Sequence, residues 1–315
     1  MTKVEHVLIV GAGIGGVRTA EQLRAAGYTG RISLVGAEQH PPYDRPPLSK
    51  QILTGEWEPE RAVLRDVSGL EDLGVRAYLG TPAVALHHDA VELADGATLH
   101  GDAIVIATGV TARVLPGQPQ RPPVHTLRTL DDALALRSAL DASRSLLIIG
   151  AGFIGAEVAT AAVAKDISVT MLEAQPVPLS RALGSEVGAM GGRLLTEAGI
   201  DVRTGVQLNR FVETDSGVGV ELADGTQITA DTIVVGIGAR PTLDWLDGSG
   251  HGSSDELVCD ERGRVRGMPG VWAVGDVAAW QDPVRGGPFR CEHWTNACDQ
   301  AKVVARTVDL FRSDE

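Results

Sequence analysis

The sequence predicts an α/β protein with two Rossmann-like, three-layer dinucleotide-binding domains in tandem. An apolar run, a GxGxxG motif and an alanine-rich helical pattern occur twice, in "HVLIVGAGIGGVRTAEQLRAAG" (6–27) and "SLLIIGAGFIGAEVATAAVAK" (145–165). A second repeated pair, "DAIVIATGV" (102–110) and "DTIVVGIGAR" (231–240), predicts strands that end in glycine turns. An Asp-Gly hairpin signal precedes each of these strands, in "LADGATLHG" and "LADGTQITA".

Each glycine of a GxGxxG loop has a separate task. The first permits the tight turn from strand to helix, the second lets the backbone approach a pyrophosphate, and the third lets helix and strand pack closely. The helix that follows offers unpaired N–H groups and a partial positive charge to the phosphates. Here each motif follows a strand-like run and opens a helix-like one, which is the context the motif requires. The glycines are Gly11, Gly13, Gly16 and Gly150, Gly152, Gly155.

A second strand after each loop ends in an acidic residue. "RISLVGAE" ends at Glu38 and "SVTMLE" ends at Glu173, where a carboxylate accepts hydrogen bonds from a ribose diol. The competing interpretation is that both glutamates are surface charges at strand ends. Glu173 would repel a 2′-phosphate, and the nearby Gln175 has no adjacent arginine, so the second loop favours NADH over NADPH.

Composition excludes several classes of protein. The net charge of −13 argues against a nucleic-acid or anionic-membrane surface, and no apolar run reaches the length of a membrane span. Cys259, Cys291 and Cys298 show no CxxC spacing and no metal-ligand pattern, so we expect buried thiols and no metal. Few cysteines and no export signal predict a cytoplasmic protein.

The stretch "PPYDRPPLSK" (41–50) has four prolines in seven residues. Proline fixes φ and lacks an N–H donor, so we expect neither a helix nor a central strand there. The stretch would instead be a stiff loop that presents Arg45 and Lys50. The competing interpretation is that both residues are solvated loop charges.

The ordered set of motifs resembles one family. GxGxxG, "PPYDRPPLSK", "ATG", a second GxGxxG with "GAEVA", "VGIG", "VWAVGD" and "EHWTNA" are similar to the FAD-dependent, NADH-using ferredoxin reductases. These serve bacterial haem monooxygenases and aromatic-ring dioxygenases, and the apoptosis-inducing flavoprotein is a relative. The resemblance covers nearly all of the chain.

The resemblance implies the domain organisation. Residues 1–112 and 242–315 would form a discontinuous FAD-binding domain, with an NADH-binding domain inserted at 113–241. Family members continue into a C-terminal interface domain, which we expect to be absent. The end of this chain, "CDQAKVVARTVDLFRSDE", instead predicts an amphipathic helix with Val303, Val304, Val308 and Phe311 on or near one face.

The resemblance also implies the site residues. Lys50 would approach the flavin edge and pair with Glu157 of the other domain, as the catalytic pair. His293 is a further proton-donor candidate, although a histidine at a helix start is more often structural. The implied FAD-binding residues are Gly11, Gly13, Gly16, Glu38, Arg45, Lys50, Val84, Thr108, Gly109, Arg113, Gly275, Asp276, Glu292, His293 and Trp294. The implied NADH-binding residues are Gly150, Gly152, Ile154, Gly155, Glu173, Gly236 and Gly238.

Three details depart from the family pattern or limit the chemistry. The arginine after "ATG" is displaced to Arg113, and the "VGIG" strand continues into Arg240 and Thr242 where the family usually has asparagine. Residues 1–258 contain no cysteine, whereas related disulfide and peroxide reductases carry a redox cysteine near the first helix. Electrons would therefore leave the flavin directly.

Several functions remain open at this stage. The leading hypothesis is an NADH-dependent oxidoreductase that passes electrons to an iron–sulfur ferredoxin of an oxygenase system. A stand-alone reductase of free flavin, quinone or oxygen is the alternative, and an NADH-binding redox-signalling flavoprotein is the second. A degenerate member without flavin is a third. A homodimer is possible, and we expect neither nucleic acid nor membrane as a partner.

Overall fold

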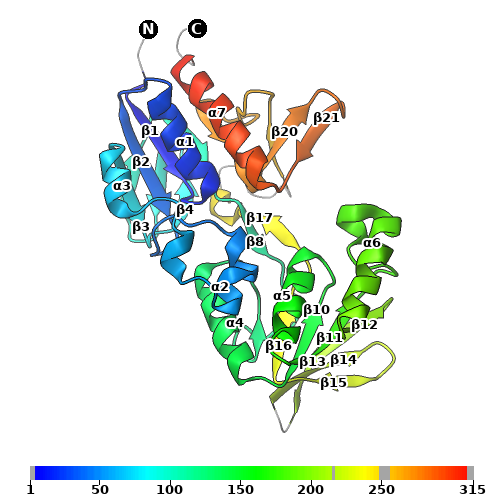
Figure 1. Cartoon of the computed structure of the whole chain (residues 1–315). Helices are drawn as coiled ribbons and strands as arrows, with labels where there is room; N and C mark the ends of the chain where they lie inside the picture. Colours follow the sequence, from blue (N-terminus) through cyan, green and yellow to red (C-terminus); the bar gives the residue numbers. More distant parts are fainter. Residues whose placement is uncertain (1–3, 215–216, 248–255, 311–315) are drawn as a thin grey trace. The chain divides into compact units, whose positions relative to one another are not determined.

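The computed structural model describes residues 4–214, 217–247 and 256–310 (Figure 1). The chain divides into two units. Unit 1 comprises residues 1–44, 63–111 and 240–315, and unit 2 comprises residues 45–62 and 112–239. Residues 45–62 thus group with unit 2, although they precede the second GxGxxG loop by almost a hundred positions in the sequence.

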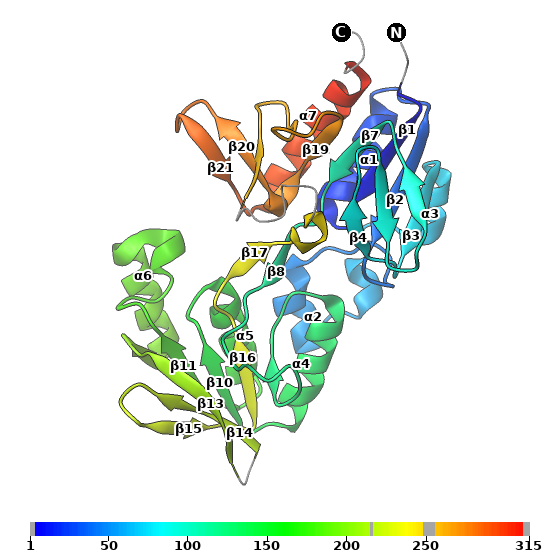
Figure 2. The same ribbon diagram turned by 180° about the vertical axis from the view of Figure 1, so that it is seen from behind.

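Unit 1 contains a five-stranded parallel sheet with the order β19-β7-β1-β2-β3. The strands are β1 (His6–Val10), β2 (Arg31–Gly36), β3 (Val75–Leu79), β7 (Ala103–Ile106) and β19 (Val271–Ala273). Its helices are α1 (Ile14–Ala25), α3 (Val67–Asp72) and α7 (Trp294–Leu310). An antiparallel sheet is formed by β4 (Ala83–Leu86), β5 (Ala90–Leu93) and β6 (Thr98–His100). Figure 2 shows β19 and β7 beside α7 and α1 from the reverse side.

The strands of unit 1 bury alternate residues on two faces, as a period of two requires. Val7 and Ile9 of β1 pack in one core with residues of α1 and α7, whereas Leu8 and Val10 pack in another with β5. The parallel sheet is therefore the middle layer of three, between helices and the antiparallel sheet. This confirms the predicted architecture for unit 1.

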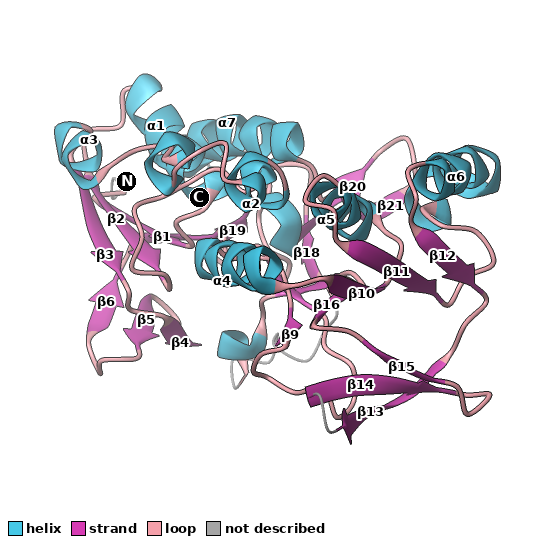
Figure 3. Ribbon diagram, turned by 60° about the horizontal axis from the view of Figure 1, so that its bottom comes forward, coloured by secondary structure: helices cyan, strands magenta, loops and turns pink. Residues whose placement is uncertain are grey.

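Unit 2 repeats this architecture. Its parallel sheet has the order β12-β11-β10-β16-β9. The strands are β9 (Val124–His125), β10 (Ser145–Ile149), β11 (Ser168–Glu173), β12 (Asp201–Thr204) and β16 (Thr232–Val235). The helices are α4 (Leu130–Ala142), α5 (Phe153–Val163) and α6 (Ser180–Glu197). The antiparallel layer is β13 (Leu208–Thr214), β14 (Gly217–Leu222) and β15 (Gln227–Thr229), which Figure 3 shows on the opposite side of the parallel sheet from α5.

The remaining elements are short. They are the 3₁₀ helices η1 (Pro46–Ser49), η2 (Pro59–Ala62), η3 (Asp244–Leu246) and η4 (Gly275–Val277), the helix α2 (Gln51–Thr54), and the strands β8 (Val110–Ala112), β17 (Ala239–Pro241), β18 (Leu257–Cys259), β20 (Ala278–Asp282) and β21 (Gly287–Arg290). Within the described part of the chain, no helix is both long and apolar enough to cross a membrane.

The two predicted Asp-Gly hairpins have the same geometry. In the first, Leu93 N–H donates to the Ala97 carbonyl at 2.8 Å and Gly96 has a φ of +85°. In the second, Leu222 N–H donates to the Thr226 carbonyl at 2.8 Å and Gly225 has a φ of +86°. Glycine takes this left-handed conformation without a steric penalty. The sequence therefore predicted both turns correctly.

In each unit, an aspartate side chain accepts hydrogen bonds from backbone N–H groups at the start of a neighbouring strand. Asp102 Oδ2 accepts hydrogen bonds from the backbone N–H groups of Glu5 and His6, at 2.8 and 3.0 Å. Asp231 Oδ2 accepts from Arg144 and Ser145, at 2.8 and 2.9 Å. The bond from Arg144 is the main reason that the pKa of Asp231 lies below its usual value. Each carboxylate thus joins the start of one strand to the start of its neighbour.

The structure corrects the expectations for the proline-rich stretch, for Val303 and for two of the cysteines. The prolines do not exclude all helix: Pro46 and Pro47 begin the 3₁₀ helix η1, because proline at the first positions has no N–H that the helix needs. Helix α7 forms as predicted with Val304 and Val308 buried, but Val303 is exposed, and Phe311 lies outside the described residues.

Among the three thiols, only one is buried. Burial raises the pKa of Cys259 to about 12, whereas Cys291 and Cys298 are half-buried.

Candidate functional site

The first GxGxxG loop joins β1 to α1 in unit 1 and has the expected geometry. Gly11 has a φ of +117°, and a Cβ there would lie 2.2 Å from the Ala107 carbonyl oxygen. A Cβ on Gly16 would lie 1.9 Å from the Gly11 carbonyl oxygen, so helix and strand are in close contact. A Cβ on Gly13, in contrast, would meet no protein atom within 4 Å. The backbone at Gly13 is therefore open to a ligand.

The second loop joins β10 to α5 in unit 2 with the same geometry. Gly150 has a φ of +105°, and a Cβ there would lie 2.4 Å from the Gly236 carbonyl oxygen. A Cβ on Gly155 would lie 2.3 Å from the Gly150 carbonyl oxygen, and one on Gly152 would meet no protein atom within 4 Å. Both loops fit a pyrophosphate, since each leaves open space where a phosphate would approach a helix N-terminus.

The two helices keep their first N–H groups for a ligand. Gly13 and Gly152 are the N-cap residues, and among the described residues no side chain caps either helix. Unpaired N–H groups and the helix dipole together favour a bound anion. This lack of capping is what a dinucleotide phosphate site requires.

The two acids differ in their partners. In unit 2, Glu173 accepts 2.8 Å hydrogen bonds from the backbone N–H groups of Ala151 and Gln175, one on each oxygen. In unit 1, Glu38 Oε2 accepts a 2.5 Å hydrogen bond from the Tyr43 hydroxyl. Both carboxylates are half-buried, Glu38 two residues after β2 and Glu173 at the end of β11. Each oxygen has lone pairs for a ribose hydroxyl.

Two further glycine turns in unit 1 are fixed by hydrogen bonds. The Thr108 hydroxyl donates to the Thr242 carbonyl at 3.0 Å, and Thr242 N–H donates to the Gly109 carbonyl at 3.0 Å. In η4, Gly275 N–H donates to the buried side-chain oxygen of Gln300 at 2.7 Å, and Asp276 is half-buried beside it. Both turns follow parallel strands of unit 1, where ligands of such sheets bind.

Helix α7 begins at Trp294, as "EHW" predicted, and its first residues are exposed. Trp294 Nε1 donates to Asp44 Oδ1 at 2.9 Å, and the Arg18 guanidinium lies 6.0 Å from the Trp294 ring centroid. His293 is exposed, and its Nδ1 is 2.8 Å from the Thr295 hydroxyl. Glu292 pairs with Arg290.

The "PPYDRPPLSK" stretch passes from unit 1 to unit 2. Arg45 donates to the Arg128 carbonyl at 2.5 Å within unit 2. Lys50 Nζ lies 2.8 Å from Glu157 Oε1, and the Ser49 hydroxyl donates to Glu157 Oε2 at 2.5 Å. The predicted Lys50–Glu157 pair is therefore present, with both members in unit 2.

Other implied residues are spread over both units. In unit 2, Arg113 donates to the Gly238 and Ala239 carbonyls, at 2.9 and 3.0 Å. Ile154 is exposed at the start of α5, and Val84 is exposed on β4 of unit 1. Among the described residues, these observations alone do not show whether Arg113, Ile154 or Val84 contacts a ligand.

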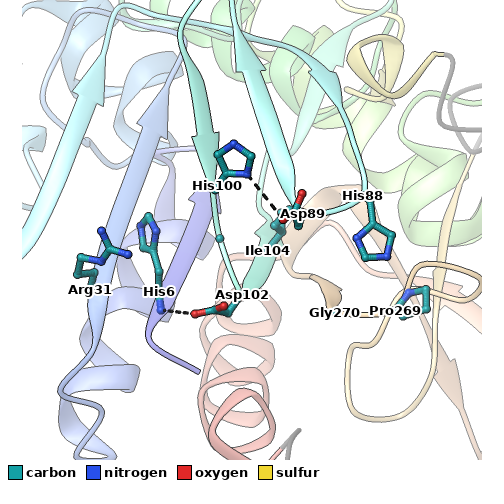
Figure 4. A pocket seen from close by; sticks show the side chains of 10 residues that line it. His6, Arg31, His88, Asp89, His100, Asp102, Ile104, Pro269 and Gly270 are labelled. Atoms are coloured by element: carbon teal, nitrogen blue, oxygen red, sulfur yellow. Dashed lines mark hydrogen bonds and ion pairs between the residues drawn. The ribbon is translucent and has the colours of Figure 1, made fainter. Parts of the chain in front are cut away.

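A pocket of about 410 Å³ lies in unit 1 beside the first residues of β1 and β7, at the edge of the parallel sheet opposite to the first dinucleotide loop (Figure 4). Its lining includes His6, Arg31, His88, His100 and Asp102. His6 Nε2 is 2.9 Å from the Ser33 hydroxyl, and burial is the main reason that the pKa of His6 is lowered. No group of three or more His, Cys, Asp or Glu in the described chain could hold a metal ion. The first dinucleotide loop lies at the other end of β1.

Sequence reasoning missed three contributors to the site. They are Ser49, Tyr43 and Gln300, whose side chains hold Glu157, Glu38 and the Gly275 turn. Ser49 and Tyr43 stand within the motif itself, and Gln300 is a polar residue on the buried face of an amphipathic helix. Each pairing joins segments that no local pattern connects, except Tyr43 with Glu38.

Two complete dinucleotide modules of this kind define a flavoprotein reductase with two dinucleotide-binding domains, which uses FAD and NADH. The family model for pyridine nucleotide-disulphide oxidoreductases matches residues 5–301. The chain belongs to this family.

Its curated relatives include components of oxygenase systems. The chain is 41% identical over 309 residues to the benzene 1,2-dioxygenase system ferredoxin–NAD(+) reductase subunit of Pseudomonas putida, covering 96% of this chain and 74% of the relative. It is 37% identical over 303 residues to rhodocoxin reductase of Rhodococcus erythropolis, covering 95% and 71%.

Solved structures of related proteins have the same fold. The ferredoxin reductase for the CYP199A2 system of Rhodopseudomonas palustris aligns with a TM-score of 0.92 at 32% identity, covering 97% of this chain and 76% of that one. Putidaredoxin reductase, in its covalent complex with putidaredoxin, aligns with a TM-score of 0.91 at 34% identity, covering 96% and 75%.

Proposed function

We propose that this protein is the reductase of an oxygenase system, which takes hydride from NADH and passes electrons through FAD to an iron–sulfur ferredoxin. The observation that carries the proposal is the Lys50–Glu157 pair, whose Nζ and Oε1 atoms are 2.8 Å apart. Glu157 lies on α5, the helix that follows the second dinucleotide loop, and Lys50 lies between η1 and α2. The relatives named above include two ferredoxin reductases and a putidaredoxin reductase, and each match spans almost the whole chain.

We assign FAD to the first loop and NADH to the second. In this assignment Gly13 and the N-terminus of α1 receive the FAD pyrophosphate, and Glu38 receives a ribose. Gly152, the N-terminus of α5 and Glu173 receive the corresponding parts of NADH. The first loop is the more enclosed of the two, as suits a resident cofactor, and the second is open, as suits a substrate that enters and leaves in each cycle.

FAD, when bound, accepts a hydride from the nicotinamide and releases electrons one at a time, which suits a one-electron acceptor. The protein contributes alignment and charge. Glu157 holds the Lys50 ammonium beside the dinucleotide loop, where its positive charge can orient the nicotinamide end of NADH. Glu173 excludes a 2′-phosphate by charge repulsion, which sets the preference for NADH.

Thiol chemistry has no part in this function. Residues 1–258 contain no cysteine, so neither the first helix nor the second loop carries a redox thiol. The electrons therefore go directly from the flavin to the acceptor. We also propose a cytoplasmic location, which the unpaired state of the three cysteines supports.

The function is tested by a coupled steady-state assay. The purified holoprotein is supplied with NADH or NADPH, an oxidised [2Fe–2S] ferredoxin and cytochrome c as the final acceptor. We expect reduction of cytochrome c to require the ferredoxin and to be faster with NADH. Equal rates without ferredoxin would contradict the proposal and favour a reductase of small diffusible acceptors.

The site assignment is tested with Lys50→Ala and Glu157→Ala. Each should slow flavin reduction by NADH about tenfold or more, much more than it lowers the FAD content, because both residues belong to unit 2 and neither is part of the first loop. Flavin reduction at the parental rate in both variants would show that the pair has no role in the reaction.

A further inference from the structure

The carboxylate of Glu157 is held on both oxygens. Lys50 Nζ is 2.8 Å from Oε1, while the Ser49 hydroxyl donates to Oε2 at 2.5 Å. A hydrogen bond to a charged acceptor is stronger than one between neutral groups. Two contacts on different oxygens fix the plane of the carboxylate, which a single contact cannot do.

The two contacts differ in rigidity. The Lys50 side chain is 46% exposed and has a long flexible stem, and exposed ion pairs of this kind fix geometry poorly. Ser49 is 4% exposed, and its hydroxyl is one rotatable bond from the backbone. The buried serine is therefore the rigid partner of Glu157, and the lysine is the adaptable one.

The backbone that carries Ser49 is itself anchored. Leu48 N–H donates to the Arg45 carbonyl at 3.0 Å and Lys50 N–H donates to the Pro47 carbonyl at 3.1 Å. Arg45 in turn donates to the Arg128 carbonyl, just before α4. The 3₁₀ helix η1 thus presents Ser49 to α5 from a braced position, with its φ angles restricted by two prolines.

We propose that Ser49 is a positioning residue for hydride transfer, acting through Glu157. Its hydroxyl fixes Oε2, so that Oε1 stays directed at the Lys50 ammonium. Without it, the carboxylate can rotate about its terminal torsion and carry the ammonium away from the nicotinamide. This inference rests on the proposed role of the Lys50–Glu157 pair and adds the residue that holds the pair in place.

The test is anaerobic stopped-flow reduction of the holoprotein by NADH over a range of concentrations. Ser49→Ala should lower the limiting reduction rate about tenfold, a typical effect of a small misplacement. The half-saturating NADH concentration should stay unchanged, because the loop and Glu173 bind the other end of the dinucleotide. Ser49→Thr keeps the hydroxyl and should restore most of the rate, with FAD content and melting temperature as controls.

A double-mutant cycle with Glu157→Ala separates positioning from a structural role. If Ser49 acts through Glu157, then adding Ser49→Ala to Glu157→Ala should cause no further slowing. An additive loss, a parental rate in Ser49→Ala, or loss of FAD from that variant would overturn the inference. If Glu157→Ala itself reduces at the parental rate, the proposed function of the pair fails instead, so the two failures are distinguishable.

Discussion

The two dinucleotide loops have nearly the same backbone but different surroundings. In unit 1 a Cβ on Gly15 would lie 3.2 Å from the Val274 side chain, and α1 packs against α7. In unit 2 the corresponding positions after the second glycine are Phe153 and Ile154, which are 53% and 39% exposed. Local geometry thus leaves space that fits a phosphate in both units, while the neighbouring side chains determine how enclosed each loop is. In the proposed assignment, this difference in enclosure separates a resident cofactor from a substrate that exchanges.

The largest effects should come from the third glycine of each loop, where the two units are alike. Gly16→Ala and Gly155→Ala place a Cβ 1.9 and 2.3 Å from a backbone oxygen, so the helix must move away from its strand. We expect each to lower the free energy of unfolding by roughly 3 kcal/mol, the cost of severe overpacking. Chemical denaturation measures this, and a change under about 0.5 kcal/mol in either variant would contradict the close packing.

The second glycine should separate the two ligands. A Cβ on Gly13 or Gly152 meets no protein atom within 4 Å, so each alanine variant should fold with a nearly parental melting temperature. Gly13→Ala should lower the FAD content, whereas Gly152→Ala should keep FAD and raise the half-saturating NADH concentration about tenfold. These two variants are matched controls for each other. If Gly152→Ala lost FAD and Gly13→Ala kept it, the assignment of the loops would be reversed.

A smaller effect should come from the acid of the second loop. Glu173→Ala removes both the acceptor for the Ala151 and Gln175 N–H groups and the charge that opposes a 2′-phosphate. We expect the preference for NADH over NADPH to fall about fivefold, roughly 1 kcal/mol. Glu173→Gln is the control, because it keeps an acceptor and loses the charge. An unchanged NADH/NADPH ratio in both variants would remove Glu173 from the ribose site.

The smallest effect is the dependence of stability on pH. One histidine in each unit has a lowered pKa, so both units should lose stability as the pH falls. Burial lowers the pKa of His125 in unit 2, against a raising influence from Asp132, and burial also lowers the pKa of His6 in unit 1. The unfolded chain therefore takes up protons first as the pH falls below about 6.5, so stability is lost on acidification.

Substituting one histidine should remove part of this acid sensitivity. His125→Leu removes a buried Nε2 that has no hydrogen-bond partner among the described residues. This substitution should reduce the drop in melting temperature between about pH 7.5 and about pH 5.5. The part of the drop that comes from the protonation of His6 should remain. The exposed His88→Leu is the control. An identical drop in His125→Leu and the parent would contradict the effect of burial.

Much of the fold was predictable because its signals are local. The repeated glycine loops, the Asp-Gly turns and the start of α7 each follow from a few adjacent residues, and both units share them. The contacts that complete the site are not local. Ser49 and Glu157 are separated by 108 positions, and Trp294 and Asp44 by 250. No periodicity in the sequence indicates such pairs.

The grouping of residues 45–62 with unit 2 likewise depends on contacts between segments that are distant in the sequence. It depends on packing of η1 and α2 against α4 and α5, which has no signature in the proline-rich stretch. The resemblance to a family predicted the Lys50–Glu157 pair without indicating the serine that holds it.

One measurement tests the whole proposal most directly: double-mixing stopped flow, with the holoprotein first reduced anaerobically by NADH and then mixed with an oxidised iron–sulfur ferredoxin or with dissolved oxygen. Flavin reduction by NADH should be fast, and reoxidation by the ferredoxin should be much faster than by oxygen. Fast reoxidation by oxygen with an inert ferredoxin would contradict the proposed function, and slow reduction by NADH would contradict the assignment of the second loop.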